Sequence, residues 1–261
     1  VKQRLSPAIN KVVDLSIGLR FSKSREYKGY RVGYATVLDR FGRLIGTITS
    51  HPFQVKGMKI PEGVMEDLIL TTLRKALSDP RIKKIYESGQ KGYLNVALHR
   101  LNFFSMEETM GIKKALSKVE KNRDLSQINC SLVSVIEKPT FVSFDKTAKF
   151  GNVARGTAFR INEKSAVLYT AGSLTSTDKR SMVYPIIVSC QNLKEEKSVF
   201  ENMGEVCNHI LNLSALHWQT VIPASVRLPA TLEFAQNIAS LSSYGVQPPT
   251  DSWLDKNLWF I

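Results

Sequence analysis

The chain has 261 residues and carries 36 Lys and Arg against 23 Asp and Glu, which gives a formal net charge of +13 at pH 7. Its hydrophobic content of 43% excludes a disordered chain, and no apolar run reaches the roughly 20 residues of a membrane-spanning helix. The N-terminus lacks the apolar segment of a secretory signal, and three separated cysteines give no disulfide framework, so we expect a cytoplasmic protein without a membrane partner.

The first sixty residues predict three successive strands, at 11–20, 30–38 and 43–50, from short β-rich apolar runs. The connection between the second and third strands, Asp39 to Gly42, is too short for a crossover helix. We therefore expect an antiparallel meander, with Asp14 embedded in its first strand.

From Pro61 the apolar residues recur at helical spacing, and this helix should end before Pro80. A strand at 92–98 follows, and then a helix from about Ser105, where Ser105 and Glu108 have the spacing of a capping box. Later elements are shorter. We expect strands at 130–136, 140–144, 156–161, 166–171 and 183–189, and helices at 199–217 and 229–243.

This order predicts a single continuous α/β domain over residues 1–261, with a mixed sheet and helices on both faces. A three-strand meander followed by strand–helix–strand units matches the ribonuclease H-like fold. Folds of this type hydrolyse phosphodiesters with two divalent cations held by clustered carboxylates. Asp14 is therefore a candidate for the first metal ligand. The alternative is an Asp at a strand end that bonds nearby backbone amides.

The basic excess is uneven, because residues 1–60 contain 12 Lys and Arg against three Asp and Glu, whereas residues 201–261 contain two against five. Such an excess over a globular domain is typical of proteins that bind polyanions, and it favours nucleic acid. The alternative is an ordinary solvated basic surface. The histidines are scattered, and His209 and His217 have no third ligand nearby, so the sequence predicts no metal motif.

Four motifs follow one another in the second half of the chain. They are GNVARGT at 151–157, STDKR at 176–180 before a strand with Tyr184, RLPATLEFAQ at 227–236, and the final LWFI. In this order they resemble the PIWI domain of the Argonaute family, which has G-N-x-x-x-G-T, a T-S-R-P-like turn, a P-A-x-x-x-x-A-[HD] helix start and an aromatic-rich end. The resemblance covers about residues 10–261.

Active members of that family carry an Asp, a Glu on a mobile finger, a second Asp and a final Asp or His. By resemblance Asp14 matches the first, and Glu62 is nominated for the Glu without a motif to support it. The second Asp belongs to an R-D-G sequence that reads HRLN here, so Leu101 takes its place, and the final ligand falls at Gln236. Neither an aliphatic side chain nor a neutral amide neutralises divalent cations. The sequence therefore predicts a nuclease fold that is not an enzyme and has no catalytic cofactor.

Binding of nucleic acid does not depend on those carboxylates, because guide-strand recognition rests on phosphate contacts and A-form shape. By resemblance Arg180 and Arg227 meet guide phosphates, and the C-terminal carboxylate of Ile261 helps to organise the guide 5′-phosphate through a cation such as Mg²⁺. Further candidates rest on charge and position alone, with ordinary solvated charge as the alternative: Lys146, Lys149, Arg155 and Lys179. We expect RNA as the guide and DNA as the target.

Residues 1–10 are too few for the MID domain that precedes PIWI in this family, so we expect MID in cis on a longer protein or as a separate chain. An inactive PIWI domain paired with MID is typical of short prokaryotic Argonautes, which cooperate with an effector protein in prokaryotic immunity. The resemblance thus implies a guide–target binding module that relays target recognition to a partner. Two alternatives remain open. One is an active metal-dependent, guide-directed endonuclease that uses Asp14 with Glu62, Glu107 or Asp145, and the other is a protein-interaction scaffold that binds no nucleic acid.

Overall fold

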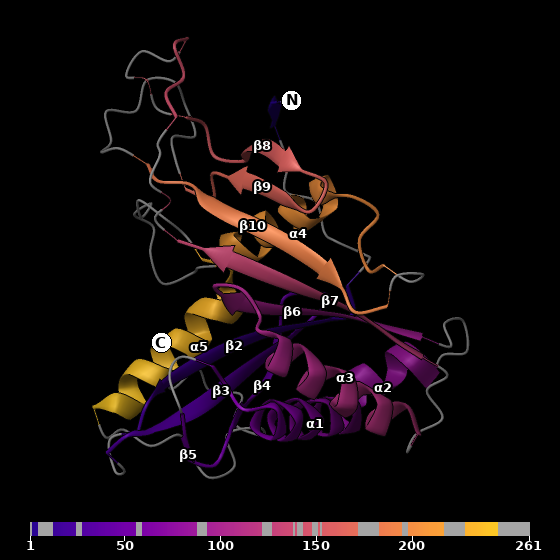
Figure 1. Ribbon diagram of the computed structural model, residues 1–261. Helices are drawn as coiled ribbons and strands as arrows, with labels where there is room; N and C mark the ends of the chain where they lie inside the picture. The colour runs from indigo at the N-terminus through magenta and orange to yellow at the C-terminus, as the bar shows by residue number, and fades with distance from the viewer. Residues whose placement is uncertain are drawn as a thin grey trace.

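A mixed ten-stranded sheet with helices packed against it forms the described part of the protein (Figure 1). The structure is a computed structural model that describes residues 2–4, 13–24, 28–55, 59–87, 93–121, 127–137, 139, 143–147, 151, 153–171, 183–194, 198–216 and 228–244. The strands are β1 (Lys2–Arg4), β2 (Leu15–Lys23), β3 (Tyr30–Asp39), β4 (Leu44–Thr49), β5 (Phe53–Gln54), β6 (Tyr93–Leu101), β7 (Gln127–Ile136), β8 (Thr157–Asn162), β9 (Ser165–Leu168) and β10 (Ile186–Asn192). The helices are α1 (Glu62–Ser78), α2 (Pro80–Glu87), α3 (Met106–Lys121), α4 (Met203–Ala215) and α5 (Ala230–Ser243).

The strand order in the sheet is β1-β8-β9-β10-β7-β6-β2-β3-β4, with β5 paired to β3. The central strands β2, β6 and β7 are parallel, and the other pairings between described strands are antiparallel. The meander β2–β3–β4 and the strand–helix–strand units after it confirm the predicted ribonuclease H-like fold class. None of the helices in the described ranges has the length and hydropathy needed to span a membrane.

The first strand of the meander is displaced from its predicted position. It begins at Leu15 and continues to Lys23, so Asp14 precedes the strand rather than lying inside it. The physical reason is the apolar alternation of Leu15, Ile17 and Leu19, which carries these side chains into the core cluster beneath α1. The strand predicted at 140–144 falls largely outside the described residues.

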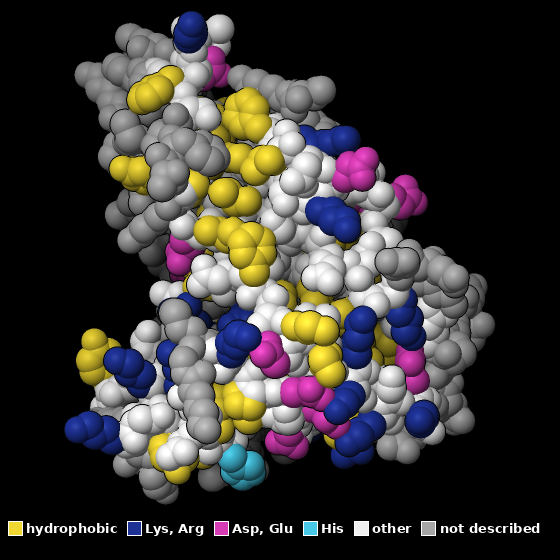
Figure 2. Space-filling view, viewed as in Figure 1, with side chains coloured by type: hydrophobic (Ala, Val, Ile, Leu, Met, Phe, Trp, Pro, Cys, Tyr) yellow, Lys and Arg dark blue, Asp and Glu magenta, His cyan; other side chains and the backbone are white. Residues whose placement is uncertain are grey.

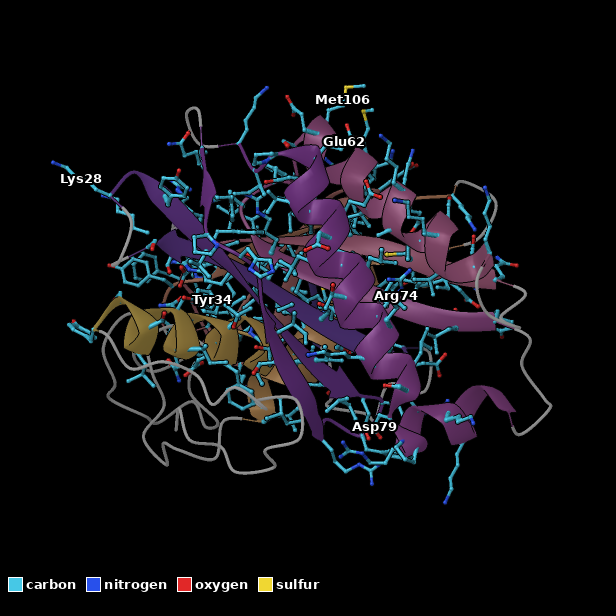
Figure 3. The ribbon with its side chains drawn as sticks, turned by 90° about the horizontal axis from the view of Figure 1, so that it is seen from below. Lys28, Tyr34, Glu62, Arg74, Asp79 and Met106 are labelled. Carbon is cyan, nitrogen blue, oxygen red and sulfur yellow. The ribbon has the colours of Figure 1, made fainter. Side chains whose placement is uncertain are left out.

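Helices α1 and α3 cover one face of the sheet and lie side by side. Figure 3 shows Glu62 and Met106, at the starts of the two helices, close to the same end of the domain. Their close approach depends on Gly111, since a Cβ there would lie 2.4 Å from the Glu62 carbonyl oxygen. The predicted capping box starts α3: the Glu108 N–H donates to Ser105 Oγ (3.2 Å), and the Ser105 N–H donates to Glu108 Oε2 (2.8 Å).

Helices α4 and α5 cover the opposite face, which confirms helices on both faces. Phe234 and Ile238 of α5 pack on Tyr34 of β3, and Figure 3 shows Tyr34 next to that helix. The start of α5 lies directly on β2. A Cβ on Gly18 would be only 2.2 Å from the Thr231 carbonyl oxygen, so this contact requires glycine.

Candidate functional site

The carboxyl end of strand β6 lies beside the parallel strand β2, three residues before β2 ends at Lys23. Gly18 pairs with His99 and Leu19 with Arg100, so one residue further along each strand stand Arg20 and Leu101. Neighbouring strands are about 4.8 Å apart. The position that resemblance assigned to the second metal-binding Asp therefore has an arginine, and not a carboxylate, as its neighbour on β2.

Both side chains belong to the face covered by α4 and α5. Arg20 pairs directly opposite Tyr34, which packs under α5, and paired residues of an antiparallel ladder share a face. Leu101 is half-buried against the apolar cluster that includes residues of α4. The sequence analysis missed Arg20. The apolar alternation of β2, which continues to Phe21, is the signal that extends the strand past this residue.

The backbone after Leu101 supports the match to the R-D-G sequence. Asn102 has a φ of 66°, in the left-handed region where glycine is favoured and Asn is the best-tolerated alternative. It stands where the motif has its glycine. Its N–H donates to the Val135 carbonyl oxygen (2.9 Å), which ends the strand firmly at that point.

Asp14 lies at the opposite end of β2 and does not join Leu101. Its backbone N–H donates to the Asn95 carbonyl oxygen, and its Oδ2 accepts from the Asn95 N–H, both at 2.9 Å. Its Oδ1 accepts from Arg40 Nη2 at 2.6 Å, and the carboxylate is fully buried. Six residues of strand separate Asp14 from Arg20, a span of roughly 20 Å at about 3.3 Å per residue. The prediction that Asp14 shares a pocket with Leu101 is wrong, and the alternative of an Asp bonding nearby backbone describes it.

Gln236 lies on α5, on the same face of the sheet as Arg20. It stands between Phe234 and Ile238, which pack on β3. Its Oε1 is buried and has no hydrogen-bond partner among the described residues, and the same holds for Ser22 Oγ. Ser22 follows Arg20 by two residues on β2, so the two side chains point to one face.

The other acidic candidates are held elsewhere. Glu62 pairs with Lys114 across α1 and α3, on the opposite face of the sheet from α5. Glu107 accepts from Lys59 Nζ (3.0 Å), and its pKa is lowered by a backbone hydrogen bond and then by Lys59. Asp145 accepts from the N–H and hydroxyl of Thr147 within its own turn. The described residues contain no group of three or more His, Cys, Asp or Glu placed to hold a metal ion.

Two buried histidines form a polar network behind the site. His99 Nε2 lies 3.2 Å from His209 Nε2, His99 Nδ1 lies 2.9 Å from Thr231 Oγ1, and His209 Nε2 lies 3.3 Å from Ser16 Oγ. Burial lowers the pKa of both rings, to about 3 for His209, and His209 adds to the effect at His99. Both rings are therefore neutral at pH 7, and they connect β2 and β6 to α4 and α5. These contacts give the two rings a structural role.

Only two of the predicted phosphate-binding residues lie in the described ranges. Lys146 is exposed on a turn between β7 and β8. Arg155 is half-buried, and its guanidinium donates to Thr170 O (2.8 Å), Leu211 O (3.3 Å) and Ser214 Oγ (3.3 Å). It therefore joins β8 and β9 to the end of α4. The remaining predicted residues lie outside the described ranges: Lys149, Lys179, Arg180, Arg227 and Ile261.

The face over α1 and α3 is not a basic surface of one sign. Figure 2 shows Lys and Arg side chains intermixed with Asp and Glu there. Ion pairs account for this mixture, namely Glu62 with Lys114, Glu66 with Lys118, and Lys59 with Glu107. Neutralised pairs attract a polyanion weakly, so this face is a poor phosphate surface compared with the carboxyl end of β6 beside β2.

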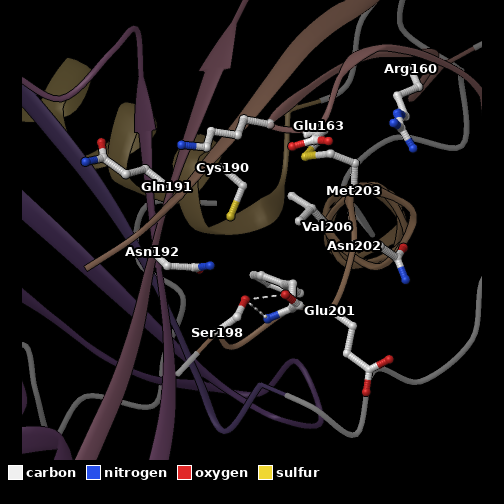
Figure 4. A pocket seen from close by; sticks show the side chains of 12 residues that line it. Arg160, Glu163, Cys190, Gln191, Asn192, Ser198, Glu201, Asn202, Met203 and Val206 are labelled. Carbon is white, nitrogen blue, oxygen red and sulfur yellow. Dashed lines mark hydrogen bonds between the residues drawn. The ribbon is translucent and has the colours of Figure 1, made fainter. Parts of the chain in front are cut away.

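A pocket of about 640 Å³ lies at the other end of the sheet, between the β8–β9 turn, the end of β10 and the start of α4 (Figure 4). Its charges are mixed, with Arg160 and Lys164 beside Glu163 and Glu201. Cys190 lines it, and burial raises the pKa of that thiol to about 11, so the thiol stays protonated at neutral pH. These features give the pocket no clear chemistry.

No protein-family model and no curated protein matches the chain. Solved structures do match. A. aeolicus Argonaute aligns with a TM-score of 0.61 and 19% identity over 94% of this chain and 32% of its own length. Clostridium butyricum Argonaute bound to a guide DNA and a target DNA aligns with 0.59 and 17%, over 89% of this chain and 27% of its own. The C-terminal lobe of a budding yeast Argonaute aligns with 0.63 and 14%, over 93% and 51%. The chain thus spans about a third of the A. aeolicus protein, and it has the PIWI-like, ribonuclease H-like fold of these C-terminal lobes.

Proposed function

We propose that this PIWI-like domain binds a guide nucleic acid and its complementary target, and that it cleaves neither strand. The single observation that carries the loss of cleavage is the position of Arg20 beside Leu101, one residue beyond the last paired positions of β2 and β6, Leu19 and Arg100. A two-metal site needs carboxylate oxygens at such a place to neutralise the cations. A guanidinium repels divalent cations, and an aliphatic side chain offers them no ligand.

Nucleic-acid binding is supported by charge and by the solved relatives. The net charge of +13 favours a polyanion. The Marinitoga piezophila Argonaute structure contains a guide RNA, and that of the Clostridium butyricum protein contains guide and target DNA. For this chain we keep RNA as guide and DNA as target, with Arg180 and Arg227 on guide phosphates and Lys146, Lys149 and Lys179 as further contacts. Arg155 is no longer in this set, because its donors are engaged within the protein.

The wider setting is part of the same proposal. A MID domain, in cis or on a second chain, completes the guide 5′-phosphate pocket, and an effector protein responds to target recognition in the prokaryotic cytoplasm. The carboxylate of Ile261 is an oxygen ligand of the kind that Mg²⁺ prefers, and it suits a cation at the guide 5′-phosphate. In this proposal, the residues that contact the target strand do not require that ion.

Two measurements on the full-length protein test this function. Affinity for a labelled guide–target duplex at two salt concentrations should fall steeply as salt rises, since phosphate contacts release counterions. Incubation of the guide-loaded protein with target and Mg²⁺ or Mn²⁺ should leave the target intact. Salt-independent or absent binding would refute the binding function, and guide-specific cleavage would refute the loss of activity.

A further inference from the structure

We propose that Arg20 binds a backbone phosphate of the target strand, at the place where a cleaving relative would hold metal ions against that strand. This inference rests on the proposed function and adds a specific contact to it. Arg20 becomes the fixed positive charge of a site that has lost its carboxylates. Its contact is with the phosphate, so it positions the duplex without reading the bases.

The first support is that Arg20 has no partner within the described part of the protein. Four other arginines of the described residues form ion pairs, namely Arg40 with Asp14, Arg43 with Asp39, Arg81 with Asp79 and Arg100 with Glu108. Arg20 takes part in no hydrogen bond or ion pair, although it is half-buried on the ordered strand β2. A guanidinium carries five N–H donors, so its unfilled donors can receive an oxyanion.

The second support is the set of unfilled polar groups on the same face. Ser22 Oγ and Gln236 Oε1 are buried without hydrogen-bond partners in the described structure. Buried polar atoms usually have partners, and an unsatisfied one destabilises the fold. The hydroxyl of Ser22 can donate to a phosphate oxygen, and the amide of Gln236 presents its NH₂ group once it is turned over. A phosphate held by Arg20 can also accept from Ser22, which lies two residues further on the same face of β2.

The third support is electrostatic. A two-metal site places net positive charge against the phosphodiester, and a lone guanidinium keeps that sign without any bound ion. Arg also matches phosphate oxygens with two parallel N–H donors, which a Lys cannot do. No carboxylate of the described residues forms an ion pair with Arg20, so none competes with the ligand for its guanidinium.

The test uses the full-length protein loaded with a guide and a series of target DNAs, each with one neutral methylphosphonate linkage. In the wild type, one linkage position should weaken binding roughly tenfold or more, as expected for one charge-assisted hydrogen-bonded contact. Arg20→Ala should weaken binding to unmodified target by a similar factor, and the penalty at that one position should then disappear. Arg20→Lys should keep the same sensitive position with a smaller penalty.

Arg160→Ala is the matched control, because Arg160 is exposed on β8 at the far end of the sheet and is also unpaired among the described residues. It should leave both the affinity and the sensitive position unchanged. If the wild type binds no duplex, the proposed function itself fails. If the wild type binds but the methylphosphonate profiles of Arg20→Ala and Arg20→Lys match it, the function stands and the role of Arg20 is refuted.

Discussion

Two charged residues of the β2 segment, Asp14 and Arg20, lie in opposite environments. Asp14, just before the strand, is fully buried, and its carboxylate accepts hydrogen bonds from Arg40 and from the backbone N–H of Asn95. Arg20, six residues further along, is half-buried and has no hydrogen-bond or ion-pair partner in the described part of the protein. Both residues are charged, so residue type alone does not distinguish their roles. The partners of each charge separate the structural group from the group left available to a ligand.

The largest expected effect is a loss of stability when the carboxylate of Asp14 is removed. Asp14→Ala should lower the free energy of unfolding by about 3–5 kcal/mol, because it leaves Arg40 and the Asn95 N–H without their buried partner. Urea denaturation followed by circular dichroism measures this. Lys59→Ala is the control, since both partners of its ion pair are well exposed, Lys59 at 69% and Glu107 at 43%, and it should cost less than about 1 kcal/mol. Equal losses in the two variants would contradict the structural role of Asp14.

A side chain at Gly18, in the middle of β2, should lower the stability of the protein. Gly18→Ala places a Cβ 2.2 Å from the Thr231 carbonyl oxygen, and the resulting displacement of α5 should cost about 1–3 kcal/mol. Thermal melting measures the loss. At Gly63, where a Cβ would meet nothing within 4 Å, the same substitution to Ala should raise stability by about 0.5 kcal/mol. A neutral Gly18→Ala would show that α5 does not pack on β2 as described.

Acid should loosen the packing of α4 and α5 on β2. The folded-state pKa values of His99 and His209 are lowered by burial, whereas an unfolded histidine titrates near 6.5. Stability is therefore fully present above about pH 6.5 and is lost as the pH falls toward the folded pKa. The expected slope is about 1.4 kcal/mol per pH unit for each histidine.

Urea unfolding at pH 7 and pH 5.5 measures this slope. His209→Gln should reduce it, and the exposed His51 offers the control variant His51→Gln, which should not change it. An acid slope that survives in His209→Gln would assign the pH dependence to other groups.

The smallest expected effect is a gain of metal affinity when carboxylates replace Arg20 and Leu101. The double variant Arg20→Asp with Leu101→Asp puts two carboxylates about one strand spacing apart, roughly 4.8 Å, where hard cations find suitable ligands. Mn²⁺ affinity, measured by calorimetry, should rise about tenfold over the wild type, or about 1.4 kcal/mol. The single variant Leu101→Asp, which keeps both Arg20 and Asp14, is the control, and it should gain nothing. A gain in this control as large as that of the double variant would return Asp14 to the site.

Much of the fold was predictable because local rules decide it. The capping box at Ser105 and Glu108 and the helix between Pro61 and Pro80 follow from neighbouring residues, and both formed as expected. The ligand positions at Leu101 and Gln236 came from a resemblance to sequence motifs, and Asn102 with its positive φ supports the first of them. Arg155 was misjudged, since its charge suggested phosphate while its partners, Leu211 and Ser214, are more than 50 residues away in the chain.

The sequence by itself determined the fold class, the basic excess and the presence of an aliphatic residue at position 101. Only the tertiary structure decided which residue of β2 stands beside Leu101. Strand register depends on how side chains from distant segments fill the core. A shift of six residues along β2 would bring the buried Asp14, and not Arg20, beside Leu101. Asp14 and Arg20 lie on one strand, and the pairing of that strand with β6 gave each its role.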